Sequence, residues 1–200
     1  HCLGRIRDNE TNGSWSYVDE ERALKRADAM DWMRNDGSAF GSLHGCPVGV
    51  KDIIEVEGMP HGCGSTLMGE VSQANAALVD ALEAAGAVIL GKTETTEFAF
   101  LNPARTKNPL SSEHTPGGSS AGSAAAVASG DVPVAIGTQT NGSVIRPASY
   151  CGVYAMKPSA GIIPRTGVFE QSPTLDQIGL FATSLEDLGL VIDVLSVHDS

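Results

Sequence analysis

Two short segments rich in glycine and serine hold the residues best suited to covalent catalysis. They are residues 117–120, Gly-Gly-Ser-Ser, and residues 141–143, Asn-Gly-Ser. Glycine lets backbone N–H groups approach a ligand closely, and a serine in such a turn can point its hydroxyl at whatever those amides bind. This is the geometry of a serine hydrolase, provided that a base removes the hydroxyl proton. The candidate base is Lys51, in the apolar stretch of residues 47–54.

Two interpretations without covalent chemistry compete for this region. A flexible linker would have a similar composition, but a helix pattern and a strand pattern separate the two segments, and linkers do not alternate with core elements. A phosphate cradle at the start of the helix after Gly118 is physically reasonable. The motif contains no lysine or arginine to bind a phosphate, so we favour catalysis.

One catalytic interpretation is the triad of an α/β hydrolase. Residues 118–122 fit the G-x-S-x-G pattern with Ser120 at its centre, and Asp176 and His198 follow in the expected chain order. The nucleophile of that fold lies on a turn that follows a strand, and residues 113–116 have no strand pattern. This triad therefore ranks behind a mechanism with a lysine base.

A lysine base must be uncharged to act. Ser143 is a poor nucleophile until its proton is removed, and only neutral lysine can remove it. Burial disfavours the charged form of a lysine and can lower its pKa by about 3–5 units. Apolar neighbours of Lys51 are placed to provide that burial: Val48, Val50, Ile53 and Ile54.

Three segments, in order along the chain, resemble the amidase signature family. Residues 44–52 resemble its lysine segment, residues 116–126 its glycine–serine motif and residues 137–148 its nucleophile segment. The similarity runs from about residue 20 to the end of the chain, and its details are typical of the bacterial amidase-like branch. We therefore identify the chain as a member of this family.

The resemblance implies a Ser-cisSer-Lys triad. Ser143 would be the nucleophile, Ser119 the bridging serine on a cis peptide bond after Gly118, and Lys51 the base. The hydroxyl of Ser119 would relay the proton from Ser143 to Lys51, and the reverse relay would protonate the leaving nitrogen.

The resemblance also implies supporting residues. Ser120 and Thr138 would support the hydroxyl network. Arg146 would either bind a substrate carboxylate or act as a structural ion-pair partner, and the sequence leaves both open. The oxyanion hole, which stabilises the tetrahedral intermediate, would consist of the backbone N–H groups of Thr140, Asn141, Gly142 and Ser143.

The chain departs from the family pattern in places. Asn141 stands where the family usually has glycine, although asparagine tolerates left-handed backbone angles better than most residues. Gln139 replaces a commoner aspartate, and Ala121 replaces a glycine. Family members are usually much longer, so the chain resembles an incomplete N-terminal portion, truncated on the C-terminal side and lacking one wall of the substrate pocket.

Length and composition narrow the alternatives. The 200 residues suit one domain, residues 1–200, and 42% of them are hydrophobic, as in ordinary globular proteins. A net charge of −11 with scattered lysines and arginines argues against a direct nucleic-acid partner. No apolar run approaches the ~18 residues of a membrane span, and the chain opens without a leader pattern. We therefore expect no membrane partner and a cytoplasmic location.

The four cysteines show no disulfide-rich spacing, which fits a reducing compartment. A repeated His-x-Cys pattern, His44 with Cys46 and His61 with Cys63, could supply a tetrahedral zinc site. Both copies lie in loops rich in glycine and proline, where a small cysteine commonly only packs. We therefore expect no metal and no organic cofactor.

Hydrophobic periodicity predicts an α/β fold with a mixed, mostly parallel sheet and helices on both faces. Residues 47–56 read as a strand, 74–85 as a helix and 87–90 as a second strand, which together form a βαβ unit with parallel strands. Before this unit, residues 19–35 read as an amphipathic helix. Its predicted buried face consists of Leu24, Ala27, Met30 and Met33.

Further elements are predicted along the chain. Ser184 and Asp187 resemble a capping box at the start of the last helix. The predicted helices are residues 93–100, 119–129 and 184–197, and the predicted strands are residues 132–136 and 153–156.

Together these patterns predict a serine amidase that hydrolyses a carboxamide C–N bond through an acyl-enzyme, with a small-molecule amide as substrate. An alternative enzyme is the glutaminase (A) subunit of a tRNA-dependent amidotransferase, which shares the motifs. An alternative from another class is a non-catalytic remnant that serves as a binding or assembly module. A half-sheet with an open edge would also favour a homodimer or a partner chain that completes the fold.

Overall fold

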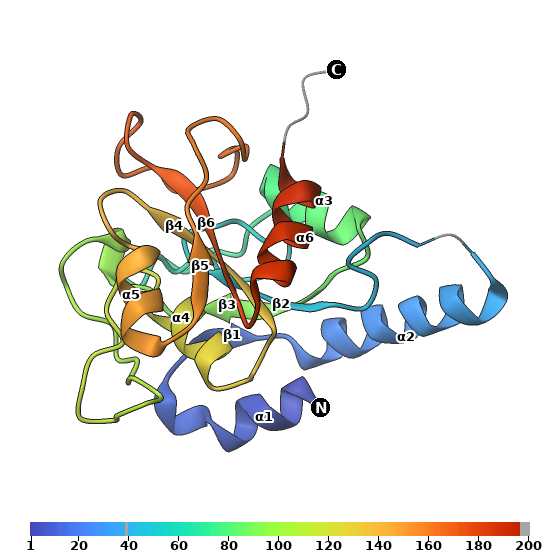
Figure 1. Cartoon of the computed structure of the whole chain (residues 1–200), viewed down its shortest axis with the longest axis horizontal. Helices are drawn as coiled ribbons and strands as arrows, with labels where there is room; N and C mark the ends of the chain where they lie inside the picture. Colours follow the sequence, from blue (N-terminus) through green and yellow to red (C-terminus); the bar gives the residue numbers. More distant parts are fainter. Residues whose placement is uncertain (39, 197–200) are drawn as a thin grey trace.

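The computed structural model describes residues 1–38 and 40–196, which form six strands, six α-helices and two short 3-10 helices (Figure 1). The strands are β1 (Trp15–Val18), β2 (Pro47–Lys51), β3 (Val88–Thr93), β4 (Val134–Gln139), β5 (Tyr154–Met156) and β6 (Gln177–Ala182). The helices are α1 (Cys2–Asp8), η1 (Glu10–Asn12), α2 (Glu20–Asp36), α3 (Ala77–Ala84), η2 (Glu97–Ala99), α4 (Ala121–Ala128), α5 (Ile145–Cys151) and α6 (Leu185–Leu195).

All six strands belong to one mixed sheet in the order β1-β3-β2-β4-β6-β5. The central strand β2 pairs in parallel with β3 and β4, so the predicted βαβ unit is confirmed. The three outer pairs, β1 with β3, β4 with β6 and β6 with β5, are antiparallel. Strands β2, β3, β4 and β5 therefore point one way, and β1 and β6 point the other.

Alternation of side chains along the strands separates two cores. On β2 and β4, Val48, Val50 and Ile136 face the core that α3 and α6 cover, whereas Ala135 on β4 and Phe181 on β6 face the core of α4 and α5. Figure 1 shows α3 and α6 together on one side of the sheet. The predicted α/β class with helices on both faces is confirmed.

Helix α2 lies close to where the sequence indicates, and its buried side includes Met30 of the predicted face but not Leu24. The Asp19 side chain accepts a hydrogen bond from the Arg22 backbone as N-cap, and Gly37 ends the helix in the left-handed conformation. Its buried residues are Ala23 and Met30. The prediction that Leu24 is buried is wrong, since its side chain is 55% exposed. A helix turns by about 100° per residue, so contact through Ala23 turns Leu24 toward solvent.

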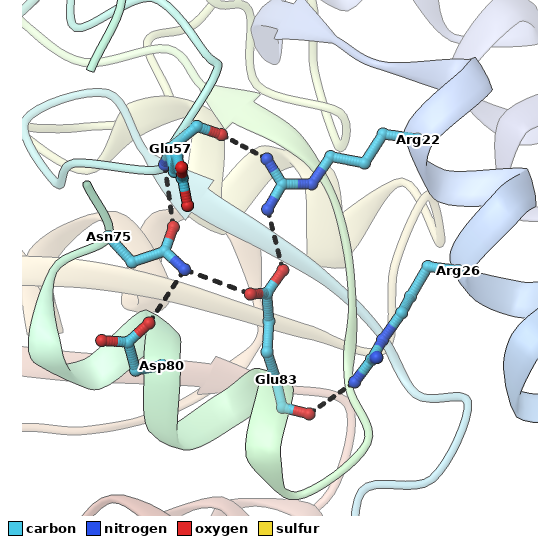
Figure 2. A network of polar contacts seen from close by, with 6 residues as sticks. All are labelled: Arg22, Arg26, Glu57, Asn75, Asp80 and Glu83. Carbon is cyan, nitrogen blue, oxygen red and sulfur yellow. Dashed lines mark hydrogen bonds and ion pairs between the residues drawn. The ribbon is translucent and has the colours of Figure 1, made fainter. Parts of the chain in front are cut away.

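Arginines of α2 fasten it to the rest of the molecule (Figure 2). Arg22 donates to the carboxylate of Glu83 on α3 and to the carbonyl of Glu57, and Arg26 donates to the carbonyl of Glu83. Asn75 also donates to the Glu83 carboxylate. This network links α2, α3 and the segment that follows β2.

Other element boundaries moved by a few residues. The predicted helix over residues 93–100 is wrong for most of its length, because β3 continues to Thr93 and only the short η2 follows. Ser184 is the N-cap of α6 as predicted, since its hydroxyl accepts from the backbone N–H of Asp187 at 3.1 Å and donates to the Asp187 carboxylate. The helix ends at Leu195, and residue 197, its predicted end, lies outside the described residues.

Candidate active site

Lys51 is the last residue of the central strand β2 and is completely buried. Its ammonium nitrogen lies 2.7 Å from the hydroxyl oxygen of Ser119 and 2.8 Å from that of Thr138. Ser119 precedes α4 and Thr138 lies on the neighbouring strand β4, so the sheet and the loop before α4 meet at this amine. The structure thus brings together two residues predicted for the triad and one predicted to support it.

Burial lowers the pKa of Lys51 to about 7, because the charged form loses its hydration. The negative charges of Asp176 and, when ionised, Cys63 act in the opposite direction. The pKa close to neutrality makes the uncharged amine available at physiological pH, as a general base requires.

Ser119 is held rigidly by its backbone. The peptide bond between Gly118 and Ser119 is cis, as the family resemblance implies. The Ser119 carbonyl accepts from the Thr96 backbone and from the Thr95 hydroxyl, each at 3.1 Å. These bonds fix the backbone position of Ser119, whose hydroxyl lies beside the Lys51 amine.

Ser143 lies in the turn between β4 and α5 and is only 5% exposed. Its carbonyl accepts from the backbone N–H of Ser120 at 3.2 Å, so the turn contacts the segment that carries Ser119. Among the hydrogen bonds of residues 1–38 and 40–196, none joins the hydroxyls of Ser119 and Ser143. The lysine half of the predicted relay is in place, whereas its serine–serine half is not closed.

The Ser120 hydroxyl forms hydrogen bonds with the backbone of strand β4. It donates to the carbonyl of Thr138 at 3.1 Å and accepts from the backbone N–H of Thr138 at 3.2 Å. The Asp176 carboxylate binds the Thr140 hydroxyl, and His198 lies outside the described residues. The role of Ser120 as a supporting residue stays a prediction, and the described residues do not include the histidine that the α/β-hydrolase triad requires.

The loop of residues 140–143 leaves its amides free. In the described part of the chain, the backbone N–H groups of Thr140, Asn141, Gly142 and Ser143 donate to no acceptor. Directly after the loop, the N–H groups of Val144 and Ile145 donate to the side-chain oxygen of Gln139, at 2.9 and 3.0 Å.

The clamp formed by Gln139 was not expected from the sequence. The only signal for it is the amide residue directly before the loop. Glutamine offers an acceptor oxygen there, as aspartate would, so this departure from the family pattern keeps the hydrogen bonds possible.

Arg146 makes a contact that was not expected from the sequence, and its binding of a substrate carboxylate stays a prediction. Its guanidinium donates to the carbonyl oxygen of Gly118 at 2.7 and 3.1 Å, and it forms no ion pair among the described residues. The bonded carbonyl belongs to the cis peptide, 28 residues earlier in the chain. Arg146 therefore supports the segment that carries Ser119.

The two His-x-Cys pairs do not converge. Within residues 1–38 and 40–196, no group of three or more His, Cys, Asp or Glu side chains could hold a metal ion. The ring of His44 stacks on Phe40, with centroids 4.3 Å apart. Burial raises the pKa of the Cys63 thiol to about 12, and the nearby carboxylate of Asp52 adds to the effect. These cysteines are protonated packing residues.

The family of the chain follows from comparison with known proteins. A model of the amidase family matches residues 1–200. The chain belongs to the amidase family. One relative is the A subunit of the glutamyl-tRNA(Gln) amidotransferase of Clostridium botulinum (strain Eklund 17B / Type B), which is 40% identical over 198 residues. The corresponding protein of Chloroflexus aggregans is 40% identical over 206 residues.

Solved amidase structures have the same fold. The peptide amidase of Stenotrophomonas maltophilia matches all of this chain with a TM-score of 0.93 at 35% identity. The match with the same type of enzyme in complex with the competitive inhibitor chymostatin has a TM-score of 0.94. Identity of this level, together with the family match, supports a shared architecture around the site.

The chain spans less than half the length of these relatives. It aligns over 96% of its own length with the Clostridium relative but over 41% of that relative, and it covers 44% of the peptide amidase. No helix in the described residues is long and apolar enough to cross a membrane.

Proposed function

We propose that this chain carries the catalytic residues of a serine amidase that cleaves a carboxamide C–N bond. The observation that carries the proposal is the fully buried amine of Lys51, with a pKa of about 7, donating to the hydroxyl of Ser119. Within residues 1–38 and 40–196, Lys51 has two hydroxyl partners and no carboxylate partner, so its charged form is costly and it is well suited to act as a neutral base.

In the proposed reaction, Lys51 takes a proton from Ser119 while Ser119 takes one from Ser143. The oxygen of Ser143 attacks the amide carbon, and the resulting oxyanion accepts hydrogen bonds from the free N–H groups of residues 140–143. Each good donor of this kind is worth about 3–4 kcal/mol of transition-state stabilisation. The relay then returns the proton to the nitrogen as the C–N bond breaks, and water hydrolyses the ester of Ser143 to release the acid.

Closing the relay requires a bond between Ser119 and Ser143. Catalytic hydrogen bonds are often long in unliganded structures and tighten when substrate binds. The bond between the Ser120 amide and the Ser143 carbonyl keeps the two serine segments together, so rotation of side chains could close the gap. We propose that residues 1–200 act as one α/β domain, because all six strands share one sheet.

A second candidate is glutaminase activity within a tRNA-dependent amidotransferase, and the similarity to two glutamyl-tRNA(Gln) amidotransferase proteins supports it. Its chemistry would use the same residues, with glutamine as the amide. Release of ammonia from glutamine, measured with and without the other components of the amidotransferase, separates the candidates. Stimulation by those components indicates the glutaminase, and hydrolysis of simple amides without them indicates the independent amidase.

Labelling with a fluorophosphonate probe tests the proposal directly, because an activated serine displaces fluoride from the phosphorus. Wild-type protein should be labelled at Ser143, and Ser143→Ala should remove the label. Lys51→Ala should slow labelling about 10²- to 10⁴-fold, the usual contribution of a general base. The control Lys25→Ala, on the exposed face of α2, should label at the wild-type rate.

Two results would reject this mechanism. Wild-type protein that does not react would favour a non-catalytic binding or assembly module. Loss of labelling in Ser120→Ala, with Ser143→Ala still reactive, would assign the nucleophile to Ser120.

A further inference from the structure

Asp176 is a buried carboxylate that the proposed mechanism does not use. It lies directly before β6 and is 8% exposed. One of its oxygens lies 2.5 Å from the hydroxyl of Thr140, and the other accepts from the backbone N–H groups of Gln171 and Ser172, at 2.7 and 2.8 Å. Asp176 therefore joins the end of β4, the loop at residues 171–172 and the start of β6.

Thr140 is the first residue of the loop with free amides. Gln139 fixes the far end of that loop through Val144 and Ile145, and the bond from Thr140 to Asp176 fixes the near end. Gln171 adds a second side-chain oxygen, 2.8 Å from the Thr140 hydroxyl. Since four unpaired N–H groups cannot orient the loop by themselves, its direction depends on these anchors.

We propose that Asp176 is a positioning residue, which fixes the loop of residues 140–143 through the Thr140 hydroxyl and so aims its N–H groups at the substrate carbonyl oxygen. The inference rests on the proposed amidase function. Hydrogen bonds to a carboxylate are shorter and stronger than those between neutral groups, so a charged anchor suits a loop that must hold one orientation.

The carboxylate also lies within electrostatic reach of the base. The negative charge of Asp176 raises the pKa of Lys51 against the effect of burial, and Cys63 would add to this only when ionised. Asparagine at position 176 can still bond Thr140 and the Gln171 backbone, but it carries no charge. Asp176→Asn should therefore keep the loop ordered and shift the pH profile of Ser143 labelling to lower pH, a change that a purely structural residue would not cause.

Variants of Thr140 test the anchor itself. Thr140→Val removes the hydroxyl, and we expect labelling of Ser143 to slow about 10- to 100-fold, because a displacement of about 1 Å near a reacting group has an effect of that size. Thr140→Ser keeps the hydroxyl and should restore most of the rate. Asp187→Asn is the matched control, since Asp187 also accepts from hydroxyls, of Thr183 and Ser184, but lies on α6.

Hydrogen exchange at the amides of Val144 and Ile145, which are hydrogen-bonded to Gln139 at the end of the loop, provides a readout that needs no activity. Exchange should accelerate in Thr140→Val and Asp176→Ala, and it should stay at the wild-type rate in Thr140→Ser and Asp187→Asn. Unchanged exchange in Thr140→Val would overturn the anchor, even if the protein labels normally. A wild-type protein that fails to label, but shows the expected exchange pattern, would refute the proposed amidase and leave the anchor standing. If Asp176→Asn and wild type have the same pH profile of Ser143 labelling, the proposed effect of the Asp176 charge on the pKa of Lys51 is overturned.

Discussion

At the scale of single residues, the site depends on one lysine that loses its hydration when the chain folds. Lys51 is buried among side chains that include the hydroxyls of Ser119 and Thr138, and its pKa falls to about 7 for that reason. An ordinary lysine would hold its proton up to about pH 10 and could not act as a base at neutrality.

The pH dependence of acylation should follow the neutral fraction of Lys51. Below its pKa the rate should fall about tenfold per pH unit, because protonation removes the base, and above about pH 8 it should reach a plateau. The measurement is the rate of fluorophosphonate labelling between pH 5.5 and 9, chosen as a rough window around that pKa. Lys51→Arg, which stays charged, should remain inactive across the range. A profile that is flat across neutrality would contradict the assignment of the base.

Part of this site was visible in the sequence. The lysine, the two serines and Thr138 occupy motifs of known order, so their approach could be predicted although they lie far apart in the chain. The contact between Arg146 and Gly118 could not be predicted from the sequence. An arginine side chain can reach many acceptors, and the sequence does not show which of them the fold brings near. The same limit applies to Gln139, whose partners are set by the course of the following turn.

At the scale of elements, α4 is positioned by close contact between backbones. A methyl group added at Gly122 would lie 2.2 Å from the carbonyl oxygen of Ser14 and 2.3 Å from the nitrogen of Glu94. Since neither backbone atom can move alone, the start of α4 would have to shift, and Ser119 lies only two residues before that helix. The glycine therefore lets the helix bring its serine to the sheet.

Gly122→Ala should destabilise the protein by about 1–3 kcal/mol or more through overpacking and should reduce Ser143 labelling. The matched control is Gly189→Ala, inside α6, where an added methyl meets nothing within 4 Å. It should stabilise the protein by about 0.5–1 kcal/mol, because alanine favours helix more than glycine does. Urea unfolding midpoints measure both. Equal effects of the two variants would refute the packing argument.

Elements with a strong local pattern were predicted correctly, and those defined by distant partners were not. The βαβ unit has its strands and helix close in sequence, which is why β2, α3 and β3 were expected. All six residues of β6 are buried, so no alternation marks it, and its pairing with β4 joins segments about forty residues apart. The face of α2 was misjudged for a related reason, since periodicity defines a stripe only to within one residue.

At the scale of the whole molecule, one edge of the sheet is open and apolar. Strand β5 ends the sheet order, and Tyr154 on it is 50% exposed. Tyr150 and Ile145 of the adjoining helix α5 are each 49% exposed. An exposed edge strand beside apolar side chains is a ready surface for pairing with another chain.

The chain should therefore self-associate as its concentration rises, or bind a partner that covers β5. Tyr154→Lys should weaken self-association, because a charge on an edge strand disfavours pairing. Trp32→Lys, on the exposed face of α2, serves as the control and should leave it unchanged. Sedimentation velocity over a range of concentrations measures both. A wild-type chain that stays monomeric throughout, or equal effects of both lysines, would exclude this edge as the interface.

The buried thiol of Cys63 can be used to measure how well the site around Lys51 excludes water. Its side chain is inaccessible, its pKa is raised to about 12, and its charge would reach both Lys51 and Lys92. Iodoacetamide should modify it only during brief openings that also admit water to the amine. Mass spectrometry can follow its carboxamidomethylation separately from that of Cys2 and Cys46, which are partly exposed. The rate at which this adduct forms would measure how often the structure opens and exposes the Lys51 amine to water.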